Sequence, residues 1–238
     1  MRTLFVYSMF MLATITLVGC AGGKNLGTIL GDLRQQAPLT QGDAAAGLKE
    51  AFTQGVTKGS TLVSQLDGYF GNPEIKIPMP ADAQKVEKTL RDIGMGSKVD
   101  DAITSMNRAA EEAAKDAAPI FVDAIRKMTF EDALALVRGD QTSGTQYLQR
   151  TTTPALTASF SPVIKSALDK VNATKYWADV MSTYNKIPLV TKVNTDLTAY
   201  VTEKAIAGLF TMIAKEEIEI RANPAARTTE LLRRVFGR

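Results

Sequence analysis

The chain opens with an apolar run that differs from every pattern after it. Residues 4–18 read LFVYSMFMLATITLV, fifteen positions without a charge, behind a start whose only charge is Arg2. This run is shorter than the roughly 20 apolar residues that cross a bilayer, and the sequence holds no second candidate span. A basic start, an apolar stretch and small residues after it are the layout of a secretory signal. We expect residues 1–19 to be cleaved and the mature protein not to span a membrane.

From about residue 40 onward, apolar residues recur at the three- and four-residue intervals of an amphipathic helix. Thr40, with Asp43 three positions later, is typical of a capped helix start, and Gly94 is a plausible helix stop. Ser161-Pro162 predicts a kink or a fresh helix start. The predicted helices cover about residues 42–66, 81–93, 98–127, 130–138, 143–171, 176–184 and 196–222, with a last helix after Asn223-Pro224.

Residues 67–82, DGYFGNPEIKIPMPAD, interrupt the helical pattern. Three prolines forbid a continuous helix there and push the residues before them toward extended geometry. Ile75 and Ile77 alternate with Lys76 as in a strand, so we expect an ordered, extended crossover with a short strand or two. The sequence thus predicts an all-α fold, a single bundle-like domain over residues 41–238 with about eight helices and one proline-rich crossover.

Composition removes several chemistries. The chain has no histidine and one cysteine, Cys20, which excludes an internal disulfide, a Cys/His zinc cluster, a Ser-His-Asp triad and a Cys-His pair. The formal charge is +3, or +2 once residues 1–19 are set aside, and this balance lacks the strongly basic footprint of a nucleic-acid binder. We therefore expect no metal, no cofactor and no nucleic-acid partner.

Cys20 has a role that its neighbours indicate. Leu17, Val18, Gly19 and Cys20 resemble the lipobox of bacterial lipoprotein precursors. The resemblance implies cleavage before Cys20 and lipid attachment to its thiol; the alternative is an ordinary secretory signal that happens to contain a cysteine. Because Ala21, and not aspartate, follows, we expect the periplasmic face of the outer membrane. Residues 20–40 would then form a tether, in which the apolar spacing is compatible with a short docked helix.

Four longer segments of the sequence together carry a resemblance to a known family: NPEIKIPMP, MNRAAEEAA, IRKMTFEDAL and the tail KAIAGLFTMIAKEEIEIRANPAARTTELLRRVFG. Over residues 40–237 the chain resembles the bacterial lipoprotein family known as domain of unknown function 4197. The resemblance implies an all-helical envelope protein. It implies no activity, substrate or catalytic residue.

Two polar clusters are candidate contact sites. In the first, Asn107 and Arg108 lie beside Glu111, and we ask whether Asn107 and Arg108 project into a cleft facing Lys76 of the crossover. The second is built around the turn RANPAAR and contains Glu217, Arg221 and Arg227. For both, the alternative is a structural salt-bridge face, since Arg108–Glu111 and Glu217–Arg221 have the i, i+3 and i, i+4 spacings of helix ion pairs.

Two further sets have competing interpretations. The five arginines after residue 220 could contact anionic lipid headgroups or complement helix dipoles, and we favour the second. Four aromatic residues could line an apolar cavity, although aromatics at helical spacing are more often core. These aromatics are Tyr176, Trp177, Tyr184 and Phe210.

The leading hypothesis is a non-enzymatic, lipid-anchored module of the bacterial envelope that binds a partner protein or an apolar ligand. It predicts a groove between the helix 98–127, the crossover 72–80 and the C-terminal helices. The enzyme alternative is a carboxylate-dependent hydrolase of envelope polymers, although adjacent Glu216 and Glu217 point about 100 degrees apart on a helix and cannot flank one bond. A purely structural role is the third hypothesis.

Overall fold

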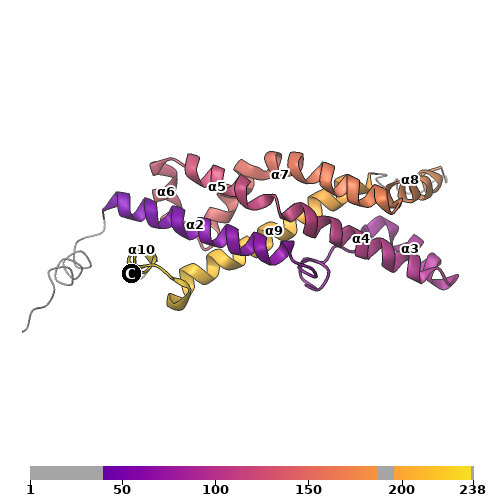
Figure 1. Cartoon of the computed structure of the whole chain (residues 1–238), viewed down its shortest axis with the longest axis horizontal. Helices are drawn as coiled ribbons and strands as arrows, with labels where there is room; N and C mark the ends of the chain where they lie inside the picture. The colour runs from indigo at the N-terminus through magenta and orange to yellow at the C-terminus, as the bar shows by residue number, and fades with distance from the viewer. Residues whose placement is uncertain (1–39, 187–195, 237–238) are drawn as a thin grey trace, which may run out of the picture. The chain divides into compact units, whose positions relative to one another are not determined.

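The computed structural model describes residues 40–186 and 196–236 (Figure 1). Within these ranges the chain forms nine α-helices, two short 3₁₀ turns and no strand, so the all-α prediction is confirmed. The signal segment, Cys20 and most of the predicted tether lie outside the described residues. The helices are α2 (Gln41–Ser64), α3 (Gln84–Asp92), α4 (Gly96–Ala114), α5 (Ala117–Lys127), α6 (Phe130–Val137), α7 (Ser143–Lys170), α8 (Ala173–Tyr184), α9 (Leu197–Ala222) and α10 (Glu230–Phe236).

The helix starts are encoded locally. Thr40 and Asp43 exchange hydrogen bonds between side chain and backbone at the start of α2, and Thr129 and Asp132 do the same at α6. Asp196 accepts a hydrogen bond from the amide of Ala199 at the start of α9. Each bond satisfies an amide that the first helical turn leaves without a partner. The capped start predicted at Thr40 is confirmed, and the helices predicted over about 130–138 and 196–222 begin with caps of their own.

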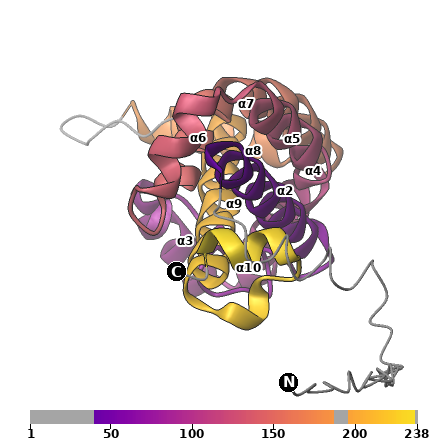
Figure 2. The ribbon, with the colours of Figure 1, turned by 90° about the vertical axis from the view of Figure 1, so that its left-hand side faces the viewer.

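The core lies where α2, α4, α7 and α9 meet. Helix α9 packs against α2 and α7, α7 packs against α4, and α5 and α6 cover α2 (Figures 1 and 2). Phe121 of α5 meets Phe210 of α9 edge to face, with ring centroids 5.6 Å apart. Alanines are buried on α4, and their small side chains allow a neighbouring helix to approach closely. Helix α10 packs beside α2, with Leu232 buried.

The predicted helix 98–127 is wrong in one respect, because it is two helices. Helix α4 ends at Ala114 and α5 begins at Ala117. Pro119 explains the break: it has no amide to donate to the carbonyl of Lys115, and its ring would clash with that carbonyl in a continuous helix. In the first turn of α5 the missing donor costs nothing, since amides there lack helical partners.

Of the kink or fresh helix start predicted at Ser161-Pro162, the fresh start is wrong, because α7 continues through Pro154 and Pro162. Both prolines are exposed, and the carbonyls that lose their helical donors belong to Arg150 and Ala158, which are exposed too. Water can satisfy those carbonyls. The core side of α7 therefore keeps its continuous stripe of buried residues, Leu156, Phe160, Ile164 and Leu168.

The crossover contains no strand within the described residues, which corrects the expectation of one or two. It is turns and extended backbone from residue 65 to residue 80. Of the four aromatics proposed as cavity or core, Trp177 and Phe210 are buried in the core and Tyr176 is 65% exposed. The side chain of Tyr184 is outside the described set. No helix in the described ranges is long and apolar enough to cross a membrane.

Contact of the Phe52 side chain, from α2, with the first turn of α7 yields a stability prediction. A methyl group added at Gly144 would lie 1.7 Å from Cζ of Phe52, so the buried ring would have to shift within the core, and Gly144→Ala should lower the free energy of unfolding by about 3 kcal/mol. The control is Gly55→Ala, where the nearest atom is 3.7 Å away. That change should be neutral or stabilise by up to about 1 kcal/mol. Urea unfolding measures both, and equal stabilities would contradict this packing.

Candidate functional site

Asn107 fixes the crossover to α4. Its Oδ1 accepts from the amide of Ile77 at 2.8 Å, and its Nδ2 donates to the carbonyls of Ile77 at 2.9 Å and Ile103 at 2.8 Å. The residue is fully buried. Asn107 thus faces the crossover, and it supplies the donor and acceptor that a neighbouring strand would otherwise supply. With its hydrogen bonds used in this way, it does not project into an open cleft.

Glu111 and Arg108 hold the turn that follows α2. The buried Oε1 of Glu111 accepts from the amides of Tyr69 and Phe70, each at 3.1 Å. Arg108 donates to Glu111 Oε2 at 2.7 Å and to Asp67 at 2.6 Å. Both hydrogen bonds raise the pKa of Arg108, and the one that it donates to Glu111 contributes most. Asp67 has φ of +67°, a conformation uncommon outside glycine, so the turn needs this external support.

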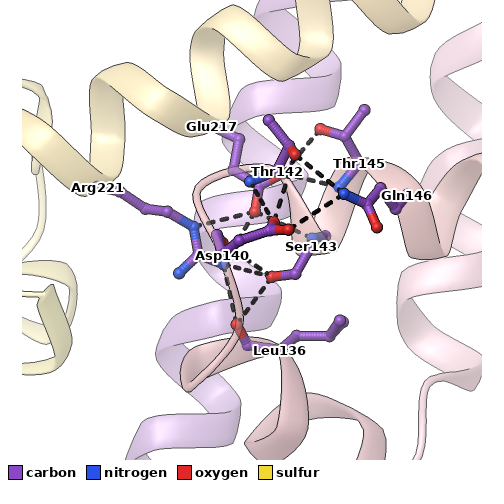
Figure 3. Close-up of polar contacts among 9 residues, drawn as sticks. Leu136, Asp140, Thr142, Ser143, Thr145, Gln146, Glu217 and Arg221 are labelled. Atoms are coloured by element: carbon purple, nitrogen blue, oxygen red, sulfur yellow. Dashed lines mark hydrogen bonds and ion pairs between the residues drawn. The ribbon is translucent and has the colours of Figure 1, made fainter.

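Glu217 caps a helix to which it does not belong (Figure 3). From α9, its carboxylate accepts from the amides of Gly144 at 3.0 Å and Thr145 at 2.7 Å, and from the Thr145 hydroxyl at 2.7 Å. These amides lie in the first turn of α7, whose N-cap residue Thr142 makes no side-chain cap. A carboxylate also complements the positive end of the helix dipole. Glu217 is 5% exposed.

Arg221 and Arg227 complete this second cluster. Arg221 donates from Nε and Nη2 to Glu217 Oε1 at 3.0 and 2.9 Å, and from Nη2 to the carbonyl of Leu136 at 3.0 Å. Arg227 is buried and donates to the carbonyls of Ile220 and Arg221 at the C-terminal end of α9. Near this site, a hydrogen bond from the amide of Thr142 is the main cause of a lowered pKa for Asp140.

In both clusters the hydrogen-bonding groups of the side chains are therefore used to hold parts of the fold together. The carboxylates of Glu111 and Glu217 accept bonds from two backbone amides and an arginine each, and neither retains an open side toward solvent. Glu216, next to Glu217, instead pairs with exposed Lys58 at 2.7 Å. Within the described ranges, no group of three or more metal-ligating side chains gathers. This geometry favours the structural interpretation of both clusters.

Of the candidate residues in the described ranges, Lys76 alone remains available for a contact. It is exposed, its Nζ lies 4.0 Å from the centroid of the Phe70 ring, and among the described residues it forms no ion pair. It lines an open groove of about 430 Å³ between the crossover and α9. The groove predicted from sequence thus exists in part, but α4 does not line it. Asn107 holds the crossover against α4, so this wall faces α9, and Gln84 at the start of α3 also lines the groove.

The crossover is fastened to α9 as well. Tyr200 donates from its hydroxyl to the carbonyl of Pro78 at 3.0 Å, and Tyr69 donates to the carbonyl of Ala205 at 2.6 Å. Gly208 allows the approach, since a methyl group there would lie 2.8 Å from the Tyr69 ring. Burial raises the pKa of both tyrosines, with a smaller contribution from Glu111 at Tyr69 and from Glu203 at Tyr200.

A second open groove, of about 550 Å³, lies between α5 and α7. Pro119, Ile120, Tyr147 and Ala155 are among its lining residues, and its one acidic lining residue in the described chain, Asp123, pairs with Lys127 at 2.6 Å. No residue selected from the sequence lines it.

Sequence reasoning missed Lys204, Tyr200 and Gly208, which build the α9 wall of the first groove. Their signal was weak, because a lysine, a tyrosine and a glycine on a long helix are ordinary. Only the position of the crossover gives them a shared surface. Pro78 and Pro80 could have indicated a segment that must find side-chain partners, since neither residue has an amide for a ladder.

The capping role of Glu217 predicts a large effect of a small change. Glu217→Gln leaves one acceptor oxygen for five hydrogen bonds and leaves Arg221 without its counter-charge, so the free energy of unfolding should fall by about 3 kcal/mol. Glu216→Gln is the matched control, because its pair with Lys58 is near the surface, and it should cost under about 1 kcal/mol. If denaturant unfolding gives the two variants equal losses, the cap is not needed.

Tyr69 predicts a pH dependence. Its pKa is raised in the folded state, so its stabilising contribution is complete below the unfolded pKa of about 10 and is lost as the pH rises above that value. Tyr69→Phe loses the bond to Ala205 and should be about 1 kcal/mol less stable at pH 8. Between pH 10 and 11 the difference in the free energy of unfolding between the wild type and Tyr69→Phe should become smaller. Unfolding curves at pH 8, 10 and 11 measure it, and a constant gap would refute the assignment.

Comparison with known proteins supports one conclusion. A family model described as "Protein of unknown function (DUF4197)" matches residues 38–237. No curated protein and no solved structure matches the chain. The match covers the whole described helical domain, including both capped clusters and both walls of the groove. The chain belongs to the DUF4197 family.

Proposed function

We propose that this protein is a non-enzymatic binding module, held at the bacterial cell envelope by lipid on Cys20, whose binding site is the groove between the crossover and α9. The observation that carries the proposal is the groove itself. Its volume of about 430 Å³ lies in the range of small-molecule sites. Its walls are held by Asn107, Tyr69 and Tyr200, so it is formed before any ligand arrives.

The carboxylate chemistry supports binding over hydrolysis. Glycoside hydrolysis needs two carboxyl groups facing each other across an open cleft. In the described chain each groove has one acidic lining residue, and each is paired with a lysine: Glu74 with Lys215, and Asp123 with Lys127. The best-placed buried carboxylates, Glu111 and Glu217, are bonded on both oxygens.

The envelope location rests on residues 1–20 alone. The apolar run, the single basic residue before it and the sequence Leu17-Val18-Gly19-Cys20 together motivate lipid attachment. Two or three acyl chains would hold the protein at a membrane with very slow release. The helical domain would then present its groove close to a membrane surface.

One purification tests both parts. The full-length protein is isolated from membranes of the host bacterium, and mass spectrometry is applied to its N-terminal peptide and to co-purifying small molecules. The N-terminal peptide should begin at Cys20 and carry acyl mass, and Cys20→Ala should leave the membrane fraction. An unmodified Cys20 would refute the anchor.

The groove is tested by filling it. Ala207→Trp places an indole in the groove from an exposed position on α9, and Ala155→Trp does the same in the groove between α5 and α7. A small molecule should co-purify with the wild type and Ala155→Trp and be depleted at least about tenfold in Ala207→Trp. If no molecule co-purifies, or if all three proteins retain it equally, this site is not a binding groove.

A further inference from the structure

The groove between the crossover and α9 carries a net positive charge. Lys76 lines it from the crossover and Lys204 from α9, and among the described residues neither ammonium group forms an ion pair. Glu74 is the acidic residue among its described lining residues, and it is neutralised by Lys215. Two cations on facing elements thus border one cleft, and among the described residues neither is held in an ion pair.

Aromatic rings position these cations. The Nζ of Lys76 lies 4.0 Å from the centroid of Phe70, and the Nζ of Lys204 lies 5.8 Å from the centroid of Tyr200. A ring face attracts an ammonium group without cancelling its charge. The arrangement therefore limits the freedom of both side chains while leaving their hydrogen-bond donors for an anion.

The backbone of the crossover is closed to peptide ligands that bind by strand addition. The amide and the carbonyl of Ile77 are both bonded to Asn107, and the carbonyl of Pro78 accepts from Tyr200. Pro78 and Pro80 have no amide to donate. Since strand addition depends on main-chain hydrogen bonds, recognition here depends on side-chain charge and apolar contact.

Apolar surface lies next to the charges. Pro78, Met79 and Ala81 line the groove on the crossover side, and Ala207 and Gly208 line it on α9. An ionic head and an apolar remainder can therefore be accommodated side by side. A purely ionic ligand would leave this apolar wall in contact with water.

We propose that the groove binds an anionic amphiphile, a single-chain molecule whose carboxylate or phosphate head lies between Lys76 and Lys204 while its apolar chain contacts Pro78, Met79 and Ala207. This inference rests on the binding function proposed for the same groove. It adds the chemical class of the ligand.

The test uses four probes, each below its micellar concentration, titrated by calorimetry into the full-length protein. Dodecanoate and dodecyl phosphate carry the two anionic heads, dodecyl maltoside has the same chain with a neutral head, and inorganic phosphate has no chain. The Lys76→Gln/Lys204→Gln variant removes the two cations. The matched control, Lys170→Gln/Lys175→Gln, removes two exposed lysines outside the groove.

The proposal expects at least one anionic amphiphile to bind, with a Kd that rises at least about tenfold in Lys76→Gln/Lys204→Gln and changes less than about twofold in the control. Affinity should also fall as salt is raised. Comparison of dodecanoate with dodecyl phosphate then identifies the preferred head. Inorganic phosphate and dodecyl maltoside should both bind at least about tenfold more weakly than the anionic amphiphile that binds best.

Three results would overturn the inference, and each leaves the proposed function to its own test. Binding of dodecyl maltoside as tight as that of the anionic probes, abolished by Ala207→Trp, would show a binding groove without charge recognition. Inorganic phosphate that binds as tightly as the anionic amphiphiles would show that the alkyl chain contributes nothing to binding. Absence of binding for all four probes would overturn the ligand class, whereas co-purification from membranes still decides whether the groove binds anything.

Discussion

A buried helix end must find partners for its backbone amides, and the rest of this domain depends on how that requirement is met at the start of α7. The first turn of α7 packs so tightly on Phe52 that Gly144 has no room for a side chain. Water cannot reach its amides there, and Thr142 does not cap them with its side chain. Glu217 supplies the missing acceptor from α9, and Arg221 balances its charge. One carboxylate thus joins the start of α7 to α9.

Other helix ends and turns follow the same rule with different chemistry. Lys49 of α2 donates to the carbonyl of Met128 just after α5, at 2.7 Å, and Arg227 donates to two carbonyls at the end of α9. Glu111 accepts from the turn after α2. The cations thus meet carbonyls at helix ends and Glu217 meets amides at a helix start, as the helix dipole favours, whereas Glu111 meets the amides of a turn. The charged residues of the two candidate clusters therefore form hydrogen bonds and ion pairs that stabilise the fold.

The crossover is the exception that leaves a surface free. Its prolines deny it a place in a sheet, and side chains from α4 and α9 replace the ladder: Asn107 from one side, with Tyr200 from the other. The buried Tyr69 ring fills the space that Gly208 leaves open. The result is a fixed wall with free cations at its edge. A wall held in place in this way loses little entropy when a ligand binds.

The sequence by itself determined the helices, their capped starts and the lipid-attachment prediction for Cys20, because periodicity, capping boxes and lipobox spacing act within a few residues. It misjudged Pro119 and Pro162, since a proline's effect depends on whether the carbonyl it deprives is in solvent or at a helix start. It selected Asn107, Glu111 and Glu217 as polar clusters but could not assign their roles. Their partners, Ile77, Tyr69 and Gly144, are 30 or more residues away, and only the packing of α4 and α9 brings them within hydrogen-bond distance. Only the tertiary structure showed the groove, for the same reason: its two walls, the crossover and α9, are far apart in the sequence, and no local pattern links them.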